Sequence, residues 1–178
     1  MGMESKSTWK NVALGVAVIV GFLAIRHAMS YYRGTQSQLD EDIVHAHYQK
    51  QINALRSFDA DTQCASLHRA YRGVDVVRSP EGEKTFEMGE REACAAIRDS
   101  MLTLKALVKS LKREPDMKFT IESVELSEDG RQATVKLRAS MQIGDELSST
   151  TSGTEVLVRA KGHVFVIDSS TRTIVEGG

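Results

Sequence analysis

Residues 87–126, EMGEREACAAIRDSMLTLKALVKSLKREPDMKFTIESVEL, contain the change of periodicity that decides the fold. In the first part apolar side chains recur every three or four residues, which predicts a long helix over residues 87–112 with one apolar face. The helical spacing ends at Glu114-Pro115-Asp116. From Phe119 onward apolar and polar residues alternate, as they do in a strand with one buried face. A shift of phase after Ile121 indicates a bulge near Glu122 or Ser123.

The alternation continues to the end of the chain. Glu128-Asp129-Gly130 is a hairpin signal, and the strand after it carries an inward face of Ala133, Val135, Leu137, Ala139 and Met141. After a polar loop over residues 144–153, residues 156–167 read as one long strand that bends at Gly162, and residues 173–175 as an edge strand. The phases place apolar side chains inward on the two clearest strands, which predicts a filled or apolar core rather than a polar catalytic cleft.

Two further helices are predicted before residue 87. The first begins near Leu39 with an acidic first turn and carries an apolar stripe of Val44, Tyr48, Ile52 and Leu55. The second, capped by Asp59 or Asp61, carries Cys64, Leu67 or His68, Tyr71 and Val74, and residues 78–85 connect it to the long helix. Three helices followed by three or four antiparallel strands predict an α+β domain over residues 39–178, with the helices packed on a curved sheet.

This order of elements resembles the nuclear transport factor two-like family of cone-shaped α+β domains. The resemblance rests on element order and strand phase over residues 38–176. It implies a curved sheet wrapped around helices, and the family includes enzymes, ligand binders and interaction modules. A membrane span ahead of such a domain also resembles the inner-membrane assembly components of type IV secretion systems.

An uncharged apolar run, Val12–Ile25, lies near the start of the chain. As a helix it would be about 21 Å long, but Trp9 and Tyr31 would lie about 33 Å apart and frame a workable span. We therefore expect a tail at 1–8, a transmembrane helix at 9–32 and a linker at 33–38. The lipid-facing anchor residues would be Trp9, Val12, Val16, Ile19, Phe22 and Ile25. A signal peptide cleaved after Ser30 is the alternative.

Cys64 and Cys94 are the only cysteines, and each falls on the apolar stripe of a predicted helix. The first interpretation is a disulfide formed in an oxidising compartment. The alternative is two buried thiols that pack as small apolar groups. The disulfide, together with the N-terminal run, predicts an inner-membrane, single-pass protein whose C-terminal domain is periplasmic.

The charge of the chain argues against nucleic acid as a partner. Residues 1–33 carry four Lys or Arg against one Asp or Glu, whereas the rest carry nineteen against twenty-three. A mildly acidic domain lacks the basic surface that phosphate binding needs. No catalytic, metal-binding or cofactor-binding motif is present in the sequence, so none of these sites is predicted.

Tyr48, Tyr71 and His163 are the candidates for lining an interior pocket of the kind the resemblance implies. The tyrosines lie on the apolar stripes of two predicted helices, and His163 lies in the last long strand. The first functional hypothesis is a non-catalytic binding or assembly module, with the lipid bilayer and a protein partner or second copy as its partners. The second is a binder of a small molecule, or an enzyme, that uses this pocket.

The intact mass of the protein from a membrane fraction tests these expectations. We expect retention of residues 1–30, and alkylation of Cys64 and Cys94 only after reduction. A mass that lacks residues 1–30 would contradict the anchor, and alkylation of both thiols without a reductant would contradict the disulfide.

Overall fold

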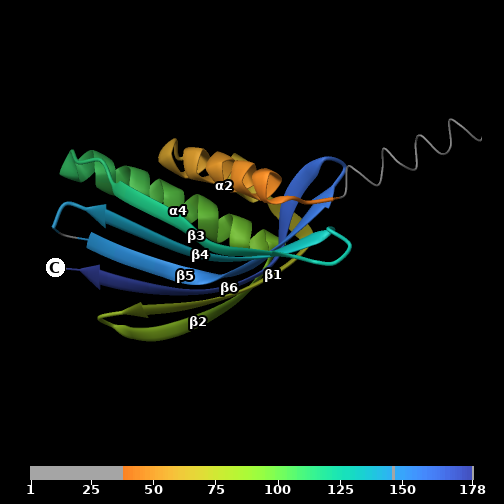
Figure 1. Ribbon diagram of the computed structural model, residues 1–178. Helices are drawn as coiled ribbons and strands as arrows, with labels where there is room; N and C mark the ends of the chain where they lie inside the picture. The colour runs from red at the N-terminus through yellow and green to blue at the C-terminus, as the bar shows by residue number, and fades with distance from the viewer. Residues whose placement is uncertain (1–37, 146, 178) are drawn as a thin grey trace, which may run out of the picture. The chain divides into compact units, whose positions relative to one another are not determined.

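Six strands form one curved sheet in the computed structural model, which describes residues 38–145 and 147–177 (Figure 1). The strands are β1 Leu67–Ser79, β2 Gly82–Gly89, β3 Asp116–Leu126, β4 Gln132–Ile143, β5 Leu147–Ala160 and β6 His163–Gly177. Their order across the sheet is β2-β1-β6-β5-β4-β3. Neighbouring strands run antiparallel, except for β1 and β6, which are parallel.

Three helices accompany the sheet: α2 Glu41–Arg56, α3 Ala60–Cys64 and α4 Glu90–Leu111. Figure 1 shows α2 and α4 along the same face of the sheet. Asp40 caps α2 by accepting a hydrogen bond of 2.7 Å from the backbone N–H of Ile43. The expected α+β class, with helices on a curved sheet, is therefore confirmed.

The predicted second helix and the predicted strand count were wrong. The helical spacing of Cys64, Tyr71 and Val74 is fortuitous, because the helix ends at Cys64 and β1 begins at Leu67. β1 gains a hairpin partner in β2 and a parallel partner in β6, and those ladder hydrogen bonds override the local pattern. The sheet has six strands among the described residues rather than three or four.

The predicted single strand over residues 156–167 was also wrong. Lys161 and Gly162 both have positive φ, 52° and 81°, and form a two-residue turn between β5 and β6. Positive φ at both central residues is the geometry that joins antiparallel strands in a tight hairpin. The expected polar loop before residue 156 is largely the first half of β5.

Other local predictions are confirmed. The β3–β4 register shifts between Ile121 and Ser123, where the bulge was expected. Gly130 has a φ of 65° in the β3–β4 turn. The inward face of β4 holds the fully or nearly buried Ala133, Val135 and Leu137.

The packed core occupies one part of the space between helices and sheet. It consists of side chains from the start of α2 and from β4, β5 and β6: Leu39, Val44, Tyr48, Ala133, Val135, Leu137, Leu157 and Val166. The apolar stripe of α4 contributes less than its regularity indicated, since only Ala93 and Met101 of that helix are buried.

A disulfide between Cys64 and Cys94 joins α3 to α4, with the two Cα atoms 5.1 Å apart. The predicted pairing is therefore present. The predicted transmembrane helix at 9–32 lies outside the described residues. Within the described part of the chain, no helix combines the length and the apolar character needed to cross a bilayer.

Replacing both cysteines, Cys64→Ser with Cys94→Ser, should lower the free energy of unfolding. The bond closes a loop of 30 residues, and on the chain-entropy model its removal costs about 3–4 kcal/mol. Urea unfolding of the variant measures this, with the reduced wild-type protein as a control. Equal unfolding midpoints for the oxidised wild type and the variant would contradict it.

Candidate functional site

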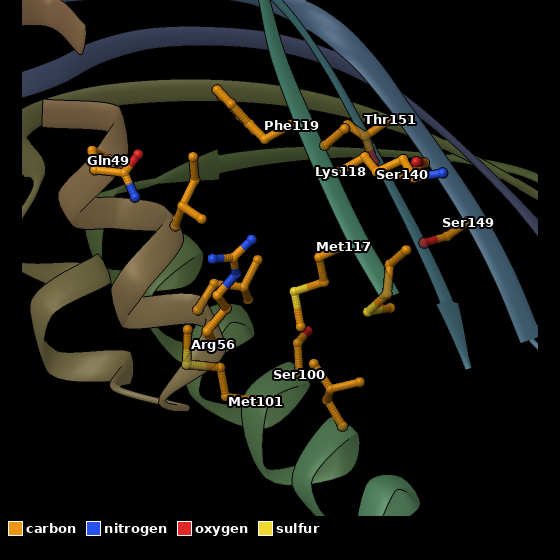
Figure 2. A pocket seen from close by; sticks show the side chains of 15 residues that line it. Gln49, Arg56, Ser100, Met101, Met117, Lys118, Phe119, Ser140, Ser149 and Thr151 are labelled. Carbon is orange, nitrogen blue, oxygen red and sulfur yellow. The ribbon is translucent and has the colours of Figure 1, made fainter. Parts of the chain in front are cut away.

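A cavity lies between the end of α2, the middle of α4 and the inward face of the sheet. Its outer compartment has a volume of about 470 Å³. Figure 2 shows its side chains gathered between the two helices on one side and β3, β4 and β5 on the other. The apolar members are Ile52, Leu55, Met101, Leu104, Met117, Phe119, Ala139 and Met141.

An inner compartment of about 470 Å³ continues toward the packed core. It shares Leu55, Phe119 and Ala139 with the outer compartment. A side compartment of about 340 Å³ runs from there toward β1 and the start of α4. The interior is therefore not filled, although its lining is mostly apolar, as the strand phases predict.

The inner compartment contains a carboxyl group, Glu155 of β5. The hydroxyl of Tyr48 on α2 donates a hydrogen bond of 2.7 Å to Glu155 Oε2. Burial raises the pKa of Glu155, and the hydrogen bond from Tyr48 partly opposes that rise. Burial, followed by the charge of Glu155, raises the pKa of Tyr48, so the phenol stays protonated and remains a donor.

Tyr71 of β1 lines the same compartment as Glu155. Its ring folds back over Gly73, where a Cβ would collide with the Tyr71 hydroxyl. Burial raises the pKa of Tyr71, and a hydrogen bond with Ser169 opposes that rise. Glycine at position 73 therefore allows the phenol to lie against the sheet.

His47 and Gln51, one turn apart on α2, also line the inner compartment. Their Nε2 and Oε1 atoms are buried and have no hydrogen-bond partner among the described residues. Burial, followed by the charge of Lys50, lowers the pKa of His47 to about 4. The imidazole is therefore neutral at pH 7.

The structure brings two of the three predicted pocket residues together. Tyr48 and Tyr71 both line the inner compartment, whereas His163 does not. His163 is exposed at the start of β6 and contributes to a separate hollow with His68 and Phe165. The Lys161–Gly162 turn explains the difference, since it reverses the chain where one continuous strand was expected.

Glu155 is the site residue that the sequence reasoning missed. It lies between the predicted polar loop over residues 144–153 and the predicted strand that begins at Val156, and the prediction assigned it to neither. The available signal was the phase of β5: Leu157 is fully buried, and Glu155 lies two residues before it on the same face. No group of three or more His, Cys, Asp or Glu side chains in the described residues is arranged to hold a metal ion.

Comparison with known proteins supports the fold. No model of a known protein family matches the sequence, and no curated protein is significantly similar to it. An NTF2-like protein of unknown function from Pseudomonas putida is similar in structure, with 16% identity, a TM-score of 0.54, and coverage of 74% of this chain and 84% of that one. One from Shewanella oneidensis has 16% identity, a TM-score of 0.53, and coverage of 74% and 97%.

A third solved structure is a putative calcium/calmodulin-dependent protein kinase type II association domain from Thiobacillus denitrificans. It has 11% identity to this chain, a TM-score of 0.52, and coverage of 72% of this chain and 92% of that one. At these identities the likeness concerns the fold alone. The described domain has the NTF2-like cone-shaped α+β fold.

Glu155→Gln should stabilise the protein at neutral pH, and the gain should shrink as the pH falls. Because the pKa of Glu155 in the folded protein is above its usual 4.5, folding at neutral pH must either bury the carboxylate or make it take up a proton, and both cost free energy. Below the usual pKa both states are protonated, and this penalty disappears. Unfolding free energies at a series of pH values, compared between wild type and variant, measure the effect. A variant less stable than wild type at neutral pH would contradict it.

Proposed function

We propose that the domain is a binding module that holds a small, mostly apolar molecule in the cavity between the helices and the sheet. The observation that carries the proposal is the outer compartment of about 470 Å³, lined largely by apolar side chains and continuous in its lining with the inner compartment. A concave, mostly apolar space with a few convergent polar groups is typical of ligand sites.

Burial of apolar surface would supply most of the binding free energy. Met101, Met117 and Met141 come from α4, β3 and β4 and line the same compartment. Methionine side chains adapt to ligands of different shape because they are unbranched and polarizable. Tyr48 and Glu155 would then orient the polar end of the molecule.

We further propose that the domain works on the periplasmic side of an inner membrane, held by the span at 9–32. Two features support this placement: the apolar run Val12–Ile25 and the Cys64–Cys94 disulfide. Disulfides persist in the periplasm and are rare in the cytosol.

Assembly with a protein partner or a second copy is the second candidate function. Half-exposed apolar side chains on β1 and β6 favour it: Val74 is 40% exposed and Ile174 40%, and the strand register places both on the same face of the sheet. Assembly through these strands does not need an open cavity. A variant that fills the cavity therefore separates the two functions.

Ala139→Phe should fill the cavity, since Ala139 lines both compartments. The probe is 2-phenylethanol, titrated by calorimetry into the 178-residue protein in detergent, with empty micelles as the blank. We expect saturable binding to wild type, weakened at least about tenfold in Ala139→Phe by overpacking of the site.

The matched control is Ser152→Phe, which adds the same ring to an exposed position on β5. It should bind 2-phenylethanol as the wild type does. Absence of saturable binding to the wild type, or equal binding to Ala139→Phe, would contradict a ligand-binding function for the cavity.

A further inference from the structure

Acidic and basic side chains line different parts of the cavity. Among the described residues that line the inner and side compartments are two carboxylates, Glu155 and Asp75, and no Lys or Arg. The cationic lining residues, Arg56 and Lys118, belong to the outer compartment. Asp75 already accepts a hydrogen bond of 2.9 Å from Thr171. Glu155 is bonded to a neutral phenol, and no ion pair joins it to a cation in the described part of the chain.

Two buried polar atoms at this inner end have no hydrogen-bond partner among the described residues. Gln51 Oε1 is an acceptor with no donor, and His47 Nε2 has no partner. His47 is 7% exposed and lines the same compartment as Glu155. Burying polar atoms without partners costs free energy, so a ligand that supplies donors would remove an existing penalty. The compartment therefore holds an acceptor, Gln51 Oε1, that a donor on a ligand would satisfy.

Aromatic rings line the same compartment as Glu155. The rings of Tyr48 and Phe119 have centroids 5.3 Å apart at an interplanar angle of 30°. Both line the inner compartment together with Tyr71. Aromatic faces attract cations, and more strongly where water is excluded.

We propose that the inner compartment recognises the ammonium group of a small amine with an apolar body. The ammonium would donate to Glu155 and to Gln51 Oε1, and the apolar body would extend past Leu55 and Ala139 into the outer compartment. This inference rests on the proposed function, since it names the class of ligand for the same cavity.

Other ligand classes fit this end of the cavity less well. An ammonium carries three donors and a positive charge, whereas an alcohol carries one donor and no charge. A carboxylate ligand would bring a second negative charge next to Glu155, which is unfavourable in a space of low dielectric. Arg56 in the outer compartment would repel an amine that entered with its ammonium outward.

Three probes with the same aromatic body test the proposal: 2-phenylethylamine, 2-phenylethanol and 3-phenylpropanoate. Each is titrated at pH 7 into the 178-residue protein in detergent, with empty micelles as the blank. We expect the amine to bind at least about tenfold more tightly than the alcohol, the range of a charge-assisted hydrogen bond. The carboxylate should bind more weakly than the alcohol.

Glu155→Gln should abolish the preference for the amine over the alcohol, because the amide keeps the size of the side chain and an acceptor for Tyr48 but carries no negative charge. The matched control is Glu125→Gln, which makes the same change at an exposed carboxylate on β3 paired with Lys136. It should keep the preference, and this comparison excludes an effect of net charge alone.

Equal affinity for amine and alcohol, or a preference that persists in Glu155→Gln, would overturn the amine proposal and leave the ligand-binding function standing. Absence of saturable binding by all three probes would overturn both. If Glu125→Gln lost the preference for the amine as fully as Glu155→Gln, the amine proposal would also be overturned, because the preference would then depend on the net charge of the protein and not on Glu155.

Discussion

The hydrogen bond between Tyr48 and Glu155 is the constraint on which the interior of this domain depends. It joins α2 to β5 across 107 positions of the chain at a distance of 2.7 Å. Tyr48 belongs to the packed core and also lines the inner compartment, so the bond lies where dense packing gives way to open space. A buried carboxylate is costly without a donor, and the phenol supplies one without neutralising the charge.

The cavity exists because the side chains of α4 do not fill the space between that helix and the sheet. The first turns of this helix are attached to α3 by the Cys64–Cys94 disulfide, and small side chains, Ala93, Ala96 and Ser100, line the side compartment beneath them. Small residues on the inner face of a helix leave volume that large ones would occupy. The disulfide therefore fixes the first turns of α4 against α3.

Much of this architecture follows from sequence periodicity, and the exceptions have physical causes. The long helix, the β3 bulge and the inward face of β4 could be predicted because each depends on local spacing alone. β1 could not be predicted in this way, because its parallel pairing with β6 joins segments about a hundred residues apart. Such a pairing produces no pattern in the neighbouring sequence. Glu155 was missed because β5 begins at Leu147, well before the predicted strand start at Val156, and because a polar residue by itself gives no sign of burial.

The most direct test of the account is the ionisation of Glu155, followed by NMR of its side-chain carboxyl carbon as the pH is varied, with and without 2-phenylethylamine. The account predicts a pKa above the usual value for glutamate in the free protein, because the carboxyl is buried without a cation. It predicts a lower pKa when the amine is present, because an ammonium stabilises the charged form. A carboxyl that titrates at its usual value and does not respond to the amine would contradict it.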